Sequence, residues 1–398
     1  MTRTVSLPRV VREREQRVTP LELFFDLVVV FAITQVTALM SHDPTWIGLG
    51  RGLLVLAAVW WAWTGYAWLT NHLEPEEGLV RAGMFAAMAA MLVVALAVPG
   101  SFGDEALVFG VAFLLVRVIN LLLYVVAARR DRDLLRPIVR LFPPAGIGAL
   151  LILAAAFADG AEQTVLWIVA LLMLYGSALV ARGQGWHISP AHIAERYGLI
   201  VIIALGESVI SLGVAASGLR LTAGIVTAAV LGIAVIAALW WAYFDVYSVL
   251  AQGQLEETSG AARARLARDY YSYLHMPMIA GVVLFALGLE VSIRHLDDPL
   301  DAIPAVALCG GLAAYFLAHV VLRLRLVYFV RHTTTDRPAW IGPGRLVAGV
   351  AMLALIPVAL AVPALLSVAL VTAVCWGLIA WDVLHYRSER GQVRQARP

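Results

Sequence analysis

The stretch VTPLELFFDLVVVFAITQ, residues 18–35, decides the fold, because it is apolar enough to span a membrane and also carries two carboxylates. A helix needs about 20 mainly apolar residues to cross the hydrocarbon core of a bilayer. Glu22 and Asp26 are four residues apart, so they lie on one face of such a helix. An ionisable group inside the membrane costs at least ~2.5 kcal/mol and usually faces other helices. The stretch therefore predicts a first transmembrane helix with a polar face buried in a bundle.

The composition of the whole chain is that of an integral membrane protein. Of its 398 residues, 61% are hydrophobic and 14% are charged, and the mean hydropathy is +0.84. Soluble domains average about 25% charged residues. The net charge of +2 does not indicate a nucleic-acid partner, because the arginines are sorted by membrane side. Cys309 and Cys375 lie in apolar runs without metal-type spacing, and the sequence indicates no cofactor and no metal site.

Twelve runs are long and apolar enough to form transmembrane helices, and their continuous apolar character excludes barrel strands. Their expected limits are 21–40, 50–70, 79–99, 104–127, 144–158, 163–181, 196–216, 222–248, 270–293, 302–322, 345–362 and 364–384. We therefore expect an all-α polytopic membrane protein with about 12 transmembrane helices. Its predicted parts are a cytoplasmic N-terminal arm 1–20, a first six-helix half 21–181, a cytoplasmic connector 182–195, a second six-helix half 196–384 and a cytoplasmic tail 385–398.

The arginines predict the orientation of the chain. When twelve helices alternate in direction, the arginine-rich stretches 127–140, 262–268 and 323–337 fall on the same side as both termini. An excess of arginine marks the cytoplasmic side of a membrane protein. We therefore expect a multi-pass protein of the bacterial cytoplasmic (inner) membrane with both termini in the cytoplasm.

Two short similarities favour an internal repeat. The motif WWAW at 60–63 returns as WWAY at 240–243, and the run that begins at Glu22 aligns with the run that begins at Glu195. Six helices per half would give two parallel repeats with the same orientation in the membrane. The alternative is a chance alignment, because apolar helices align easily with one another.

Ten ionisable residues within or beside the predicted helices form the predicted substrate or proton pathway. They are Glu22, Asp26, Arg117, His192, Glu195, Arg196, Glu207, Asp245, His275 and His319. Glu207 follows Tyr197 by about 15 Å of helix, which is near the membrane midplane, and Arg117 is a candidate partner for it. Most of the others are expected in one buried cluster near the cytoplasmic side. The basic partners of Glu22 and Asp26 are expected among Arg81, Arg196, His275, His319 and Arg323.

Each of these assignments has a structural alternative. Glu22 and Asp26 are also suited to the N-terminal end of a helix, where carboxylates cap free amides. His192 and Glu195 are typical of a helix start, and Glu207 of a structural ion pair. A metal site made of His192, Glu195, His275 and His319 has suitable ligand types but lacks a recognised spacing. The tryptophans at 60, 61, 63 and 68 are expected in packing and at the membrane interface.

Three stretches together resemble the low temperature requirement A family of bacterial membrane proteins. They are TPLELFFDLVVVFAITQ (19–35), ERYGLIVIIALGES (195–208) and HMPMIAGVVLFALGLE (275–290), and the likeness extends over nearly the whole chain. The resemblance implies a polytopic inner-membrane protein. It implies no biochemical activity, because the family name describes a growth requirement in the cold. It emphasises, without assigned roles, the motif positions Glu22, Phe25, Asp26, Glu195, Arg196, Gly206, Glu207 and His275.

Three functions fit the sequence, and transport is favoured over catalysis. The first is a secondary, proton-coupled transporter of an unidentified small solute or lipid, because buried acidic residues serve that purpose in such proteins. The second is a membrane-embedded enzyme acting on a lipid or isoprenoid with the His, Glu and Asp cluster. The third is a non-catalytic sensor or assembly factor. The expected partners are the lipid bilayer, the substrate and protons; nucleotide-binding loops are absent from the sequence, and the oligomeric state is left open.

The arginine asymmetry predicts the result of cysteine labelling. In a chain with Cys309 and Cys375 replaced by serine, single cysteines near residues 130, 265 and 335 should be shielded from an impermeant thiol reagent added to intact cells. A cysteine in place of Arg220 is the external control and should react. Reaction from outside at any two of the three shielded positions would reverse the predicted orientation.

Overall fold

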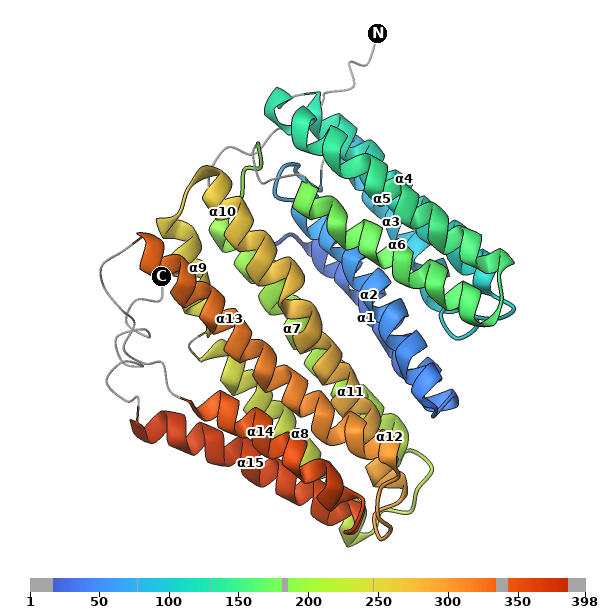
Figure 1. The fold of residues 1–398 in the computed structure, drawn as a ribbon, viewed down its shortest axis with the longest axis vertical. Helices are drawn as coiled ribbons and strands as arrows, with labels where there is room; N and C mark the ends of the chain where they lie inside the picture. Colours follow the sequence, from blue (N-terminus) through green and yellow to red (C-terminus); the bar gives the residue numbers. More distant parts are fainter. Residues whose placement is uncertain are drawn as a thin grey trace. The chain divides into compact units, whose positions relative to one another are not determined.

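The computed structural model describes residues 17–76, 78–129, 131–180, 185–245, 247–333 and 343–385, and Figure 1 shows that these residues are built from helices. The described residues contain no strand, only an isolated β-bridge between Pro299 and Pro363. The predicted all-α fold is confirmed. Nearly all of the predicted N-terminal arm and tail lies outside the described residues.

The chain divides by its contacts into two compact units. Among the described residues, unit 1 takes those up to Asp43, Ile47–Tyr197 and Leu255–Ser272. Unit 2 takes Pro44–Trp46, Gly198–Gln254 and those from Tyr273 onward. The predicted division into halves 21–181 and 196–384, and the repeat symmetry between them, stay predictions.

The first helices of the chain belong to unit 1, where α3, α4, α5 and α6 lie side by side (Figure 1). Their bounds are α1 Pro20–His42, α2 Trp46–Leu69, α3 Gly78–Ala97, α4 Ala106–Ala128, the short 3-10 turn η1 Arg132–Leu134, α5 Leu135–Ala154, the 3-10 turn η2 Ala155–Phe157 and α6 Gly160–Val180. Helix α7, Pro190–Ala216, begins in unit 1 and contributes its residues from Gly198 onward to unit 2.

The later elements mostly build unit 2. They are α8 Ala223–Phe244, α9 Tyr247–Glu257, α10 Gly260–Ala267, the π-helical turn η3 Arg268–Tyr273, α11 His275–Arg294, α12 Ala302–Ala305, the π-helical turn η4 Val306–Gly310, α13 Gly311–Thr333, α14 Gly344–Ala359 and α15 Ala364–His385. Helix α10 and most of η3 belong to unit 1.

Eleven helical segments among the described residues are long and apolar enough to cross a membrane, and α14 is a shorter apolar helix. Each of the twelve predicted runs therefore coincides with a helix, although the predicted start of the fifth, at residue 144, was wrong. That segment begins at Arg132 and contains Pro143 and Pro144. Its first turns are amphipathic, because Arg132, Arg136 and Arg140 are exposed while Leu134 and Ile138 are buried. A search for continuous apolar character does not detect such an extension.

The arginine-rich stretch 262–268, which lies between two of the predicted transmembrane runs, is also helical. Residues 260–267 form α10, and Arg268 begins η3. Alanine, leucine and arginine all have high helix propensity, which explains a helix in this arginine-rich stretch. The prediction placed this polar stretch outside the apolar runs. It did not recognise that the polar stretch is helical as well.

Helices α11 and α13 of unit 2 approach each other so closely that glycine is required on both. A Cβ atom added to Gly281 would lie 2.5 Å from the carbonyl oxygen of Gly311, and one added to Gly311 would lie 2.6 Å from the carbonyl oxygen of Gly281. Because these neighbours are backbone atoms, they cannot turn away as a side chain would. Small residues at such crossings are typical of helix packing in membranes.

Gly281→Ala should therefore destabilise unit 2 by about 1–3 kcal/mol, the usual cost of overpacking. The measurement is the thermal unfolding midpoint of the purified protein in detergent. Gly253→Ala is the matched control, because no atom lies within 4 Å of the added Cβ on this helical residue. Equal midpoints for the two variants would show that the close helix crossing is not a stabilising constraint.

Candidate functional site: a buried charge quartet

Four ionisable side chains without solvent exposure meet between α1 and α7 in unit 1, and we call them the charge quartet: Glu22, Asp26, His192 and Arg196. The Nε2 atom of His192 lies 2.9 Å from Oε1 of Glu22, within hydrogen-bond distance. Nη1 of Arg196 donates to Oδ2 of Asp26 at 2.9 Å, and its Nε lies 3.7 Å from Oε1 of Glu22. The arginine is thus shared by both carboxylates.

The local sequence fixes the quartet at two helix starts. Thr19 is the N-cap of α1, its hydroxyl accepts a hydrogen bond from the Glu22 amide, and its own amide donates to Oε2 of Glu22 at 2.8 Å. This reciprocal arrangement is a capping box. Pro20 and Pro190 occupy the first positions of α1 and α7, where the missing amide hydrogen has no cost. One oxygen of Glu22 therefore caps the helix, as the structural alternative predicts, and the other meets His192.

Aromatic side chains extend the hydrogen bonding around the quartet. Nε1 of Trp63 donates to Oδ1 of Asp26 at 2.8 Å, and the Trp63 ring lies 4.9 Å from the ring of Tyr197. The hydroxyl of Tyr197 is 3.0 Å from Oγ of Ser272 in η3. Sequence reasoning assigned Trp63 to packing, so it missed this contact. The available signal was chemical: a buried carboxylate needs several donors, and the indole nitrogen is a donor only.

The charges of the quartet do not cancel without an additional proton. Arginine stays protonated in proteins, so ionised Glu22 and Asp26 with Arg196 leave one net negative charge. A buried charge without compensation costs several kcal/mol. One bound proton, on His192 or on a carboxylate, makes the quartet neutral. The partial positive charges at the N-termini of α1 and α7 offset part of the negative charge of the two carboxylates.

These contacts test the expected basic partners of Glu22 and Asp26. Arg196 was among the expected basic partners and is confirmed as the partner of Asp26. His192 was not among them, although it is the nearest base to Glu22. Arg81 is exposed and donates to the carbonyl oxygen of Glu76.

Glu195 lies on the same helix but outside the quartet. Its side chain is exposed, and Oε2 accepts a hydrogen bond from the Val18 amide at 3.0 Å. The expectation that Glu195 is part of a buried cluster was wrong. His192 and Arg196, four residues apart, define the buried stripe of α7, and Glu195 falls beyond its edge.

The remaining residues of the predicted pathway are distributed over both units. Glu207 is 1% exposed in the middle of α7 and accepts a hydrogen bond from Ser211 at 3.0 Å. His275 and His319 are buried in unit 2, where the Tyr243 hydroxyl lies 2.9 Å from Nε2 of His275. Nδ1 of His319 is 2.9 Å from the carbonyl oxygen of Tyr315. Asp245 is half-buried at the C-cap of α8.

Arg117 is buried in α4 of unit 1, where it lines a cavity. Glu207 belongs to unit 2, and its predicted pairing with Arg117 stays a prediction.

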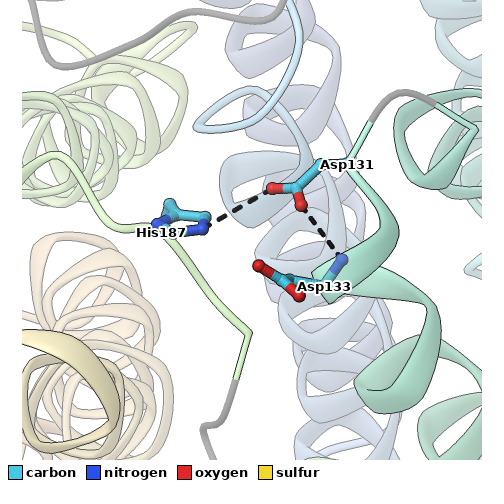
Figure 2. A group of neighbouring side chains, drawn as sticks. All are labelled: Asp131, Asp133 and His187. Atoms are coloured by element: carbon cyan, nitrogen blue, oxygen red, sulfur yellow. Dashed lines mark hydrogen bonds and ion pairs between the residues drawn. The ribbon is translucent and has the colours of Figure 1, made fainter.

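A separate group of potential metal ligands lies in unit 1, outside the predicted pathway (Figure 2). Nε2 of His187 is 3.6 Å from Oδ2 of Asp131, and the other carboxylate oxygen accepts from the Asp133 amide at 3.1 Å. Through this hydrogen bond Asp131 caps the N-terminus of η1, and this structural role explains the position of its side chain without a metal ion. The His187 side chain is 71% exposed. We assign no metal site to this group.

Helices of membrane-spanning length with charged residues buried among them define a polytopic helical membrane protein. A family model described as bacterial low temperature requirement A protein (LtrA) matches residues 17–380. The chain belongs to this family. It is also 30% identical over 284 residues, 69% of each chain, to the uncharacterized protein RA0937 of Rhizobium meliloti (strain 1021). No solved structure matches the chain.

The shared arginine predicts an asymmetry among variants of the quartet. Arg196→Gln leaves two carboxylates without their cation and should cost about 3–5 kcal/mol of stability. Adding Asp26→Asn removes one of these charges and should restore part of the loss. The measurement is the thermal unfolding midpoint in detergent, with Arg81→Gln, an exposed arginine of α3, as the control. A double variant no more stable than Arg196→Gln would contradict the shared ion pair.

Proposed function

We propose that the protein is a secondary transporter of the bacterial cytoplasmic membrane that couples movement of a small solute or lipid to proton transfer. The charge quartet is the observation that carries this proposal. It is removed from solvent, lies within membrane-spanning helices and reaches neutrality with one proton. Proton relays in pumps and transporters are built from buried carboxylates and histidines of this kind.

Three further features of the chain support this function. Glu207 provides a second carboxylate deep in a membrane-spanning helix, and burial disfavours a permanent charge at that position. His275 and His319 are buried in unit 2 and add two imidazole groups, a side chain that can both accept and donate a proton. The arginine asymmetry of the sequence supports an orientation with both termini in the cytoplasm. The proposed pathway thus consists of the quartet, Glu207 and the two histidines, with Arg117 at the cavity of unit 1.

We expect one variant of the quartet to separate solute transport from proton coupling. Asp26→Asn leaves Glu22 and Arg196 to neutralise each other, so the quartet no longer needs a proton. In liposomes that contain a pH-sensitive dye, a panel of small solutes identifies a substrate by the proton movement it causes with the wild-type protein. With that substrate, Asp26→Asn should retain counterflow exchange and lose accumulation driven by an imposed pH gradient.

The matched control is Glu162→Gln, a neutralised exposed carboxylate at the start of α6. It should accumulate the substrate as the wild-type protein does. Full gradient-driven accumulation by Asp26→Asn would exclude the quartet as the coupling site. Solute movement without any proton movement in the wild-type protein would reject proton-coupled transport.

A further inference from the structure

A cavity of about 60 Å³ lies in unit 1, and its walls come from α2, α4, α5, α6, α10, η3 and the segment before α7. Four aromatic side chains form much of the wall: Trp61, Trp68, Tyr124 and Trp186. An ordered water needs at least about 10–15 Å³ by such a measure. The cavity therefore has room for about four to six water-sized groups, which corresponds to a small organic molecule.

Two buried side chains at this cavity have donors without acceptors. Arg117 is 9% exposed and Asn120 is 2% exposed. Nε and Nη1 of Arg117 and Nδ2 of Asn120 have no hydrogen-bond partner among the described residues. Leaving a buried donor unsatisfied costs about 1–3 kcal/mol, and more when the group is charged. The cavity thus has an excess of donors, which is complementary to a ligand rich in acceptors.

The excess charge at the cavity is a single positive charge. Arg268 also lines it, but its Nη2 donates to Oδ1 of Asp269 at 2.7 Å and its Nη1 to the carbonyl oxygen of Ala178 at 3.3 Å. No carboxylate in the described part of unit 1 forms an ion pair with Arg117. A ligand with one negative charge would neutralise the cavity, whereas a doubly charged phosphate monoester would reverse its charge.

Gly65 keeps the cavity open beside the guanidinium. A Cβ atom at this position of α2 would lie 2.8 Å from Nη1 of Arg117 and 3.0 Å from Oδ1 of Asn120. Any side chain here would push the two polar groups from their positions. The absence of a side chain at Gly65 therefore leaves the charged end of the cavity accessible to a ligand group.

We propose that this cavity binds a small monocarboxylate with a short apolar body. The charged guanidinium of Arg117 offers unpartnered donors at Nε and Nη1 to a carboxylate, and Asn120 adds a third donor. The aromatic wall accommodates the apolar body, as in most small-molecule sites, where few polar groups fix the orientation. Binding at equilibrium does not require the proton coupling proposed above, so either proposal can fail while the other stands.

The test uses three probes that share a short chain and differ in charge: butyrate, butyramide and n-propyl phosphate. The purified full-length protein in phosphatidylcholine nanodiscs is titrated while tryptophan fluorescence is recorded, because three tryptophans line the cavity. Butyrate should bind saturably, and the neutral amide and the phosphate monoester should bind about tenfold more weakly or worse. Absence of saturable butyrate binding, or equal binding of butyramide, overturns the proposal.

Variants identify the site. Arg117→Gln should weaken butyrate binding by about tenfold or more, since it removes the charged donors. Arg51→Gln, the same change at the other end of the unit 1 helix α2, is the matched control and should bind as the wild type does. Gly65→Ala keeps every charge and should also weaken binding, so it gives the answer if Arg117→Gln does not fold. Wild-type affinity in either Arg117→Gln or Gly65→Ala overturns the assignment.

A second arm of the experiment separates a soluble carboxylate from an acidic lipid, whose phosphodiester also carries one negative charge. The butyrate titration is repeated in nanodiscs that contain phosphatidylglycerol. Unchanged affinity supports a soluble monocarboxylate as the ligand. Competitive loss of butyrate binding would show that a lipid headgroup occupies the cavity and would overturn the assignment to a soluble ligand.

Discussion

The ion pair between Arg196 and Asp26 is the interaction on which the rest of the site depends. Neither side chain has access to water, so each relies on protein groups for the stabilisation that solvent would supply. This need explains why the indole of Trp63 donates to Asp26 and why a histidine lies beside Glu22. The carboxylates, the histidine and the arginine are held by α1 and α7, each of which begins at a proline. It also explains why the first helix of the chain tolerates carboxylates that would otherwise disfavour membrane insertion.

The quartet and the cavity share structural supports although they use different ionisable residues. On α2, Trp63 donates to Asp26, while Thr64 and Trp68 of the same helix line the cavity. Ser272 of η3 lies at the cavity, accepts from Nε1 of Trp68 and also contacts the hydroxyl of Tyr197, the residue next to Arg196. Directly contacting side chains therefore connect the quartet with the cavity.

The sequence predicted the helices well because an uninterrupted apolar run has few alternatives in a bilayer. It included Arg196 among five candidate partners of Glu22 and Asp26, because few cations are available to neutralise a buried carboxylate. The prediction failed where burial depends on the position of a residue around its helix, or where a contact depends on residues distant in the sequence. The start of α5 is amphipathic rather than apolar, and Glu195 is directed away from the stripe formed by His192 and Arg196. The roles of Trp63 and Gly65 depend on groups distant in sequence, Asp26 and Arg117, and no local pattern encodes such contacts.

The contact between Gly281 and Gly311 has a consequence for the dependence of unit 2 on temperature. Burial of apolar groups from water weakens on cooling, because it is driven largely by solvent entropy near room temperature. Helices that already lie in lipid associate instead through van der Waals contact, interhelical hydrogen bonds and lipid entropy, without release of water from apolar surface. Glycine also has no side-chain rotamers to lose when the helices meet. The close contact between α11 and α13 therefore does not depend on the hydrophobic effect of water, which weakens on cooling.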